Sequence, residues 1–407
     1  MNIMKKILVL ILTLNTITNG YSQTSEEFYK RGIVKDSLKD YKGAITDYTK
    51  AIEMDVKYTD AYSKRGTIKV ALEDIQGAIA DFNKAIEIDP NNYSAYNNRG
   101  NAKADLKDYQ GAILDYNKTI EINPNDKAYF DRGIAKADLK DYQGAIADYS
   151  KAIEYNSTYY LNYHNRGVAK YNLKDFQGAI TDYNKAIKID STFSFTYAIR
   201  GEAKDGLKDY QGAIADYDKA IEIDPNHVIA YFKRGVAKYY LKDYQSAIKD
   251  YNKAIQIDPN DAGIYIKRGL AKVNLKDYRD AIADYNKAIE FDSTYYGTYF
   301  NRGIAKQNLN DYRGAIADYN KSLEINPNFD SAYLNRGSAK FELKDYQGAI
   351  LDFTKAIQLD VNDASAYYNR GLSKINLKQK NNGCLDLSKA GELGYEYAYD
   401  AIKQYCN

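Results

Sequence analysis

Side chains able to perform acid–base or nucleophilic chemistry are few in this chain. Histidine occurs only as His164 and His227, and cysteine only as Cys384 and Cys406. Nucleophilic catalysis needs a serine or cysteine beside a base that a third group orients, and no such set can be assembled if the two cysteines pair with each other. The glycines form no phosphate-binding loop, and the acids of the 360–363 loop lack the full calcium-binding pattern. We therefore expect no catalytic residues, no metal, no cofactor and no enzymatic activity.

The charged residues, in contrast, recur at a fixed interval. An Arg-Gly pair appears every 34 residues, except for one interval of 33 residues between Arg99 and Arg132. The marker arginines are Arg31, Arg65, Arg99, Arg132, Arg166, Arg200, Arg234, Arg268, Arg302, Arg336 and Arg370. Eleven copies at one period indicate a stacked array, in which each unit contacts mainly its neighbours.

Each copy has the residue spacing of two amphipathic helices. In the copy at 96–124, Gly100 and Lys103 in the first half, and Ala112 and Tyr116 in the second half, lie three or four residues apart. This interval is typical of one face of a helix. Two short helices joined by a tight turn cannot bury both their faces alone, so the copies are expected to pack side by side.

On these residues the chain resembles the tetratricopeptide-repeat family, whose unit is a 34-residue helix–turn–helix. With the marker arginine as position 7, the family has an aromatic residue at positions 4 and 24, small residues at 8, 20 and 27, and often proline at 32. The third copy supplies Tyr96, Tyr116, Gly100, Ala112 and Pro124 at the corresponding places. The pattern covers nearly everything after residue 24.

The resemblance implies an all-α fold. It is a right-handed superhelical α-solenoid of about eleven 34-residue helix-turn-helix repeats at 25–397, with a C-terminal capping helix and tail at 394–407. Between the two helices of a copy stands Lys-Asp-Tyr, and its aspartate, for example Asp108, is well placed to cap the second helix. We find no linker or change of composition between copies, so we expect one continuous domain.

The chain departs from the family at positions 7 and 11, which here are always arginine and lysine. A buried cation needs a partner, and an aspartate stands sixteen residues after each marker arginine. Positions 7 and 23 lie about equally far from the turn, so they face each other on antiparallel helices. We interpret them as a ladder of structural ion pairs that fixes helix register, extended by the position-11 lysine. The pairs include Arg99 with Asp115, Arg200 with Asp216, and Arg302 with Asp318. Alternatively, both groups are solvated and recur only through duplication.

Cys384 and Cys406 lie ten and twelve residues from Gly394, the expected turn between the last repeat and the capping helix. An antiparallel hairpin would bring them together, and in an exported chain this favours a disulfide. A zinc site or a reactive thiol is the alternative, but two cysteines without a nearby histidine form a poor zinc site.

The first 22 residues have the pattern of a cleaved signal peptide. Lys5 and Lys6 precede an apolar run at 7–14 that is too short to span a bilayer, and Gly20 and Ser22 suit cleavage before Gln23. An uncleaved membrane anchor is the alternative. The signal peptide resembles those of bacteria, and we expect export to the periplasm, the cell surface or the medium. The cleaved chain would carry 55 basic and 55 acidic side chains, and this balance argues against nucleic acid as a partner.

The family resemblance also implies where a partner would bind, because first helices line the concave surface and positions 2, 5, 9, 12 and 13 commonly touch partners. Copies two and three offer polar residues there, and later copies offer apolar ones, with asparagines at position 6. The candidate groove residues are His164, Asn165, Val168, Tyr171, Phe232, Val236, Tyr239, Tyr240, Ile266, Phe300, Asn301 and Asn335. The alternative is that these side chains fill a tight superhelix and contact each other. For His164, plain surface is favoured over a ligand contact, and His227 is expected to be an exposed loop residue.

The leading hypothesis is an exported, non-catalytic scaffold that binds a protein or peptide in this groove. The alternatives are a cell-envelope glycan binder that uses stacked tyrosines, and a self-assembling structural rod. The family's clamp for a C-terminal carboxylate uses lysine at position 5 with asparagine at 9, and no copy has that combination. Recognition of chaperone tails by that route is therefore not expected.

Overall fold

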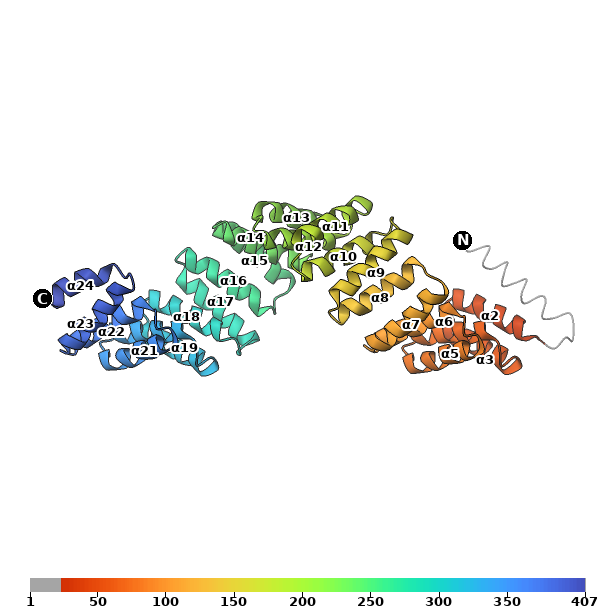
Figure 1. The fold of residues 1–407 in the computed structure, drawn as a ribbon, viewed down its shortest axis with the longest axis horizontal. Coiled ribbons are helices and arrows are strands. Elements are labelled where there is room, and N and C mark those ends of the chain that lie inside the picture. Colours follow the sequence, from red (N-terminus) through yellow and green to blue (C-terminus); the bar gives the residue numbers. More distant parts are fainter. Residues whose placement is uncertain (1–22, 407) are drawn as a thin grey trace. The chain divides into compact units, whose positions relative to one another are not determined.

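The computed structural model describes residues 23–406, so the predicted signal peptide lies outside the described residues. Every regular element between these limits is an α-helix (Figure 1), as the repeat pattern predicted. The helices are α2 (Ser25–Ser37), α3 (Tyr41–Met54), α4 (Thr59–Ala71), α5 (Ile75–Ile88), α6 (Tyr93–Asp105), α7 (Tyr109–Ile122), α8 (Asp126–Asp138), α9 (Tyr142–Tyr155), α10 (Tyr160–Asn172), α11 (Phe176–Ile189), α12 (Ser194–Gly206), α13 (Tyr210–Ile223), α14 (Val228–Tyr240), α15 (Tyr244–Ile257), α16 (Ala262–Asn274), α17 (Tyr278–Phe291), α18 (Tyr296–Asn308), α19 (Tyr312–Ile325), α20 (Asp330–Glu342), α21 (Tyr346–Leu359), α22 (Ala364–Asn376), α23 (Lys380–Glu392) and α24 (Tyr397–Tyr405).

The helices form two compact units, which we describe separately. The first unit ends at Ser191 and contains α2 to α11, and the second begins at Thr192 and contains α12 to α24. Within each unit, every helix packs against the helix before it and the helix after it. The first helices of successive copies also contact each other, α4 to α10 in one unit and α12 to α22 in the other. Each unit therefore presents a row of first helices.

Backbone hydrogen bonds build the turn within each copy, and in nine of the eleven copies an aspartate also caps the second helix. In the third copy, the N–H groups of Lys107 and Asp108 donate to the carbonyls of Ala104 and Lys103, at 2.8 and 2.9 Å. This is the Schellman arrangement, which satisfies the last carbonyls of a helix. Lys107 has a φ of 62°, and the corresponding residue of every other copy has a similar value. A side chain in this conformation costs about 1 kcal/mol. Asp108 then caps α7 by accepting the N–H of Gly111 at 2.9 Å, which confirms its predicted role.

Close approach of the two helices explains the glycine after each marker arginine. Tyr116 of α7 is buried, as is Ala112 on the same helix. A Cβ atom at Gly100 of α6 would come within 2.7 Å of Cε1 of Tyr116, so a larger residue would push the ring out of place. In the first ten copies the core is therefore an aromatic ring from the second helix set against glycine in the first, and in the last copy Leu387 takes the place of the ring.

The structure brings the ion-pair partners together in all eleven copies. Nε and Nη2 of Arg99 donate to Oδ2 and Oδ1 of Asp115, at 2.9 and 2.5 Å, and Nζ of Lys103 lies 2.8 Å from the same carboxylate. The Asp115 side chain is only 4% exposed, so the two cations replace its water. The same two-pronged contacts join Arg200 to Asp216 and Arg302 to Asp318.

The marker arginines also link neighbouring copies, which the sequence analysis did not foresee. Nη1 of Arg99 donates to Oδ1 of Asn83 in the preceding copy at 2.6 Å, and Cζ of Arg99 lies 5.4 Å from the centre of the Tyr96 ring. Arg370 reaches Thr354 in the same way, at 3.1 Å. Each such arginine thus stabilises one helix pair and its junction with the previous pair.

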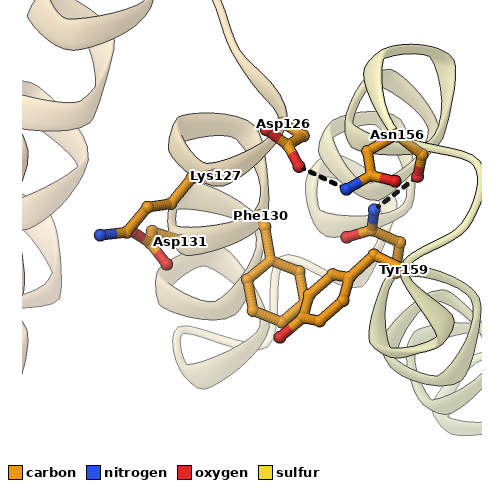
Figure 2. Close-up of a pocket in the computed structure, with 7 residues that line it drawn as sticks. Asp126, Lys127, Phe130, Asp131, Asn156 and Tyr159 are labelled. Atoms are coloured by element: carbon orange, nitrogen blue, oxygen red, sulfur yellow. Dashed lines mark hydrogen bonds between the residues drawn. The ribbon is translucent and has the colours of Figure 1, made fainter. Parts of the chain in front are cut away.

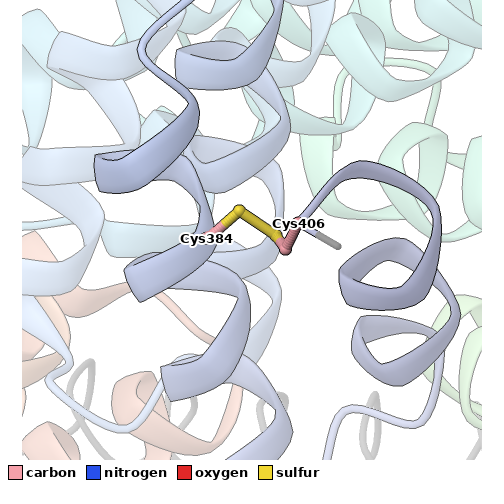
Figure 3. Close-up of a disulfide and its surroundings, with 2 residues drawn as sticks. All are labelled: Cys384 and Cys406. Carbon is pink, nitrogen blue, oxygen red and sulfur yellow. A yellow bond between two sulfur atoms is a disulfide. The ribbon is translucent and has the colours of Figure 1, made fainter.

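A short terminal helix follows the last repeat. Gly394, with a φ of 88°, lies between α23 and α24. A disulfide joins Cys384 of α23 to Cys406, the residue after α24, with Cα atoms 5.8 Å apart (Figure 3). Between residues 23 and 406, no helix is long and apolar enough to cross a membrane. That part of the chain also contains no group of three histidine, cysteine or acidic residues that could hold a metal ion.

Candidate functional site

Two adjoining cavities lie along the first helices of copies three to five, within the first unit. The larger has a volume of about 350 Å³ (Figure 2) and is lined by Asp126, Lys127, Phe130, Asp131, Asn156, Tyr159 and Asn162. The smaller, of about 90 Å³, is lined by Tyr93, Ser94, Asn97, Asn98, Thr119, Asn125 and Lys127. Because Lys127 borders both, the cavities follow one another across α6, α8 and α10. We call the larger one the α8–α10 pocket.

The shortened connection between copies three and four positions one side of the α8–α10 pocket. Asn125 caps α8 by accepting the N–H of Ala128 at 3.0 Å. Asp126 therefore stands at the start of the helix, where its Oδ2 accepts a hydrogen bond of 2.9 Å from Nδ2 of Asn156. This hydrogen bond links the first residue of α8 to the segment between α9 and α10.

Two aromatic rings form another side of the α8–α10 pocket. Tyr159 occupies the capping position of α10 but makes no side-chain capping bond. Its ring instead meets the edge of Phe130, with centroids 5.6 Å apart. Phe130 also lies 5.9 Å from the ring of Tyr149 in the core of its own copy, which holds it in place. The first helices that begin after Tyr58, Phe193, Tyr295 and Phe329 likewise have an aromatic residue without a capping bond at this position.

Two further polar side chains border the α8–α10 pocket. Oδ2 of Asp131 accepts a bond of 3.3 Å from Nδ2 of Asn97. Burial raises the pKa of Asp131, while the bond from Asn97 and the charge of Lys127 act in the opposite direction. Asn162 is fully buried, and its Nδ2 donates to the carbonyl of Asn156 at 3.2 Å. Oδ1 of Asn162 has no hydrogen-bond partner.

The predicted groove residues are divided between the two units, and many pack against their own copy. Phe232, Val236 and Tyr239 of α14 lie against the core of the second unit. The hydroxyl of Tyr239 accepts a bond of 3.0 Å from Nδ2 of Asn274. Tyr240 is 57% exposed and stacks on Tyr210 at 5.3 Å. In this region, therefore, part of the predicted aromatic surface is already committed to intramolecular contacts.

Two of the remaining predicted groove residues also make contacts within the chain. Phe300 of α18 lies 4.7 Å from the ring of Phe329. Nδ2 of Asn335 donates to the carbonyl of Ser331 in its own helix at 2.8 Å. Ile266 and Asn301 are half-buried on α16 and α18.

Four of the predicted groove residues lie on α10 in the first unit. His164, Asn165, Val168 and Tyr171 are half-buried there. The ring centre of His164 is 5.9 Å from that of Tyr183, and burial lowers its pKa to about 4. The imidazole is therefore neutral at neutral pH.

The expectation for His227 was wrong. This residue is only 4% exposed, and its Nδ1 accepts the N–H of Ala230 at 3.3 Å, so it caps α14. Its ring lies 4.7 Å from Phe195. The connection between copies was correctly located, but the ring at its capping position packs against Phe195 of α12, so its burial could not be inferred from its place in a loop.

Comparison with known proteins agrees with this architecture. Family models described as "Tetratricopeptide repeat" match residues 93–126, 162–193, 228–261 and 297–329, and residues 25–57, 127–159 and 262–295. One described as "TPR repeat" matches 66–107, 207–241 and 337–376. The chain belongs to the tetratricopeptide repeat family. Among curated proteins, none matches this repeat chain.

Several solved structures are similar to parts of the chain or to most of it. YrrB, described as a TPR protein with an unusual peptide-binding site, is 21% identical, covers 45% of this chain and 95% of its own, and has a TM-score of 0.42. A tetratricopeptide repeat protein from Parabacteroides merdae is 20% identical, with 61% and 99% coverage and a TM-score of 0.46. Yeast Tom70 is 16% identical, with 94% and 95% coverage and a TM-score of 0.40.

Within the tetratricopeptide repeat, Lys127 and Phe130 occupy positions 2 and 5, which the family resemblance assigns to the partner-binding face. None of the predicted groove residues lies in this fourth copy. A signal was available: Asp131 is the only acid at position 6 among the eleven copies, and Asn162 stands at position 3, where six copies have alanine. Comparing the copies position by position would have singled out both residues.

Proposed function

We propose that this protein is an exported, non-catalytic scaffold that binds an extended segment of a partner protein along its first helices. The observation that carries the proposal is the pair of adjoining cavities across α6, α8 and α10. They lie in a tetratricopeptide repeat protein, on the side of each repeat that the family uses for partners. Apolar rings beside amides and carboxylates suit a peptide, whose backbone and side chains need both kinds of contact.

The surroundings of the cavities favour a peptide backbone over a compact ligand. The amides of Asn97 and Asn98 border the smaller cavity and the rings of Phe130 and Tyr159 border the larger one. Amides offer both a donor and an acceptor to a main chain. An extended segment would pass from one cavity to the next, with Lys127 between them.

Site-specific photo-crosslinking tests the proposal. A benzoylphenylalanine at Phe130, and in a second variant at Tyr240, is expected to capture partner proteins from cell-envelope fractions. The matched controls carry the same group at Leu114 and Leu351, which occupy position 22 of the second helix and are 66% and 68% exposed. If the control positions capture the same proteins with the same yield, binding along the first helices is contradicted.

The predicted groove of the second unit is tested in the same experiment. The double variant Phe232→Asp/Tyr239→Asp is compared with the wild-type chain, because both rings lie on α14 among the candidate residues. Loss of partners with an unchanged melting temperature would extend the binding surface to this unit. Capture of identical proteins would restrict it to the first.

A further inference from the structure

The α8–α10 pocket contains two carboxylates and one cation, Lys127, whose charge acts on Asp131 without forming an ion pair with it. Asp126 and Asp131 border it from α8, and neither makes an ion pair within the described residues 23–406. Lys127 is the basic residue of the lining, and Figure 2 shows its side chain running away from the rings of Phe130 and Tyr159. The interior of the pocket is therefore acidic.

Asp131 differs from the buried acids of the repeat. Each position-23 aspartate, such as Asp148 in the same copy, forms ion pairs with an arginine and a lysine. The Asp131 carboxylate accepts a hydrogen bond from the amide of Asn97 and forms no ion pair. A partly buried carboxylate without a direct ion pair is unfavourable for the fold, so this residue is better explained by a ligand than by stability.

Asn162 adds an independent observation. Its side chain is fully buried in the lining of the pocket, its Nδ2 is used by the carbonyl of Asn156, and its Oδ1 has no donor. A buried oxygen without a donor costs about 1–3 kcal/mol. Alanine at this position in six other copies shows that the repeat does not need the amide. The unused acceptor points to a ligand that brings an N–H group.

The aromatic side of the pocket fits the same ligand. Phe130 and Tyr159 meet edge to face at 5.6 Å, and aromatic faces attract a cation within about 6 Å. A planar guanidinium stacks on such a ring while its edge donates hydrogen bonds.

We propose that the α8–α10 pocket binds the side chain of an arginine in the partner segment. The guanidinium would lie against the two rings and donate to Asp131 and to Oδ1 of Asn162, with Asp126 adding negative charge at the entrance. The acceptors lie on separate sides of the pocket. The five N–H donors of a guanidinium suit this arrangement better than the compact ammonium of lysine does. The assignment rests on the proposed function, since it names the side chain that a bound peptide would insert.

Peptide arrays test the assignment with the purified full-length chain. The probes are pools of random decapeptides in which one central residue is fixed as arginine, citrulline, lysine or glutamate. We expect the arginine pool to bind at least about tenfold more tightly than the citrulline pool, because citrulline keeps the shape but loses the charge. Lysine is expected to be intermediate and glutamate weakest.

The copies of the repeat supply conservative variants. Asp131→Asn introduces the residue that five other copies have at position 6, and Asn162→Ala the residue that six have at position 3. We expect each to weaken binding of the arginine pool, about tenfold and about fivefold, respectively. Both should leave the melting temperature close to the wild-type value, whereas a merely structural role would lower it. Asp330→Asn, at position 1 of copy ten, is the control that should leave binding unchanged.

The outcomes separate this inference from the proposed function. Binding of peptides without preference for arginine, or binding that Asp131→Asn leaves unchanged, overturns the arginine pocket while the scaffold remains. Failure of every pool to bind argues against peptide binding altogether, and with it against the pocket. Arginine preference that disappears in Asp131→Asn supports both.

Discussion

At the scale of single residues, burial sets the protonation of several carboxyl and imidazole groups. Asp205 of α12 accepts a bond of 2.6 Å from the hydroxyl of Tyr217, while its other oxygen is buried and has no partner. Burial raises the pKa of Asp205 to about 6, from an ordinary value of 3.8. The folded chain therefore holds this proton more tightly than the unfolded chain. The resulting stabilisation is present below about pH 4 and is lost as the pH rises to about 6.

Asp205→Asn should remove this pH dependence, because the amide oxygen still accepts the bond from Tyr217 and carries no charge. We expect the variant to be about 1 kcal/mol more stable than the wild type at pH 7.5, after allowance for partial exposure. At pH 4 the two should be nearly equal. Melting curves at the two pH values measure the difference. A variant less stable than the wild type at pH 7.5 would contradict this account.

At the scale of helices, the marker ion pairs join the two helices of a copy and the copies to each other. Asp216 of α13 forms ion pairs with Arg200 and Lys204 and is 3% exposed. Lys219 lies on the same helix but is paired with Glu222 on an exposed face. Loss of the buried carboxylate removes the negative charge that Arg200 and Lys204 share, which is far more costly than loss of a solvated pair.

Asp216→Ala is therefore expected to cost about 3 kcal/mol of unfolding free energy. Lys219→Ala should cost less than about 0.5 kcal/mol. Thermal or denaturant unfolding of both variants checks the comparison. Equal effects would mean that the ladder contributes no more than a surface pair.

The terminal helix depends on a covalent link. The disulfide closes the segment of 22 residues between α23 and the end of α24. Restricting a loop of this size in the unfolded chain stabilises the fold by about 3 kcal/mol in the chain-entropy account. Reduction, or Cys384→Ser/Cys406→Ser, should increase hydrogen exchange in α24 first and leave α14 unchanged. Two free thiols in the mass spectrum of the unreduced protein would contradict the link.

At the scale of the molecule, repeated helix pairs give two units whose helices each contact their neighbours in the chain. In such an array a substitution acts mainly on its own copy and the adjoining ones. The residues of the α8–α10 pocket all come from one such junction, between copies four and five. A binding site can therefore change without disturbing distant repeats.

Export is proposed for the whole chain, and the proposal rests on the sequence of residues 1–22. If these residues direct secretion, the mature protein should begin at Gln23. N-terminal sequencing of the chain from envelope fractions or from the medium checks this. An intact Met1 on a chain recovered only from the cytosol would contradict export.

The sequence determined the fold because the repeat makes every local signal appear many times. The Asp108 cap, the small Gly100 beside Tyr116, and the spacing of Arg99 and Asp115 all follow from intervals within one copy. Such short-range geometry is set by helix pitch and by one tight turn, so counting residues was sufficient. The cysteine pairing followed in the same way from distances to Gly394.

The tertiary structure decided what single residues do where copies meet. It buried His227 against Phe195, gave Arg99 a second partner in Asn83, and left Oδ1 of Asn162 unpaired in the pocket that Asp131 also lines. These features depend on side chains from different copies that approach within a few ångströms. Periodicity places each copy in the array, but it does not determine which irregular side chains fill a junction and which leave a cavity.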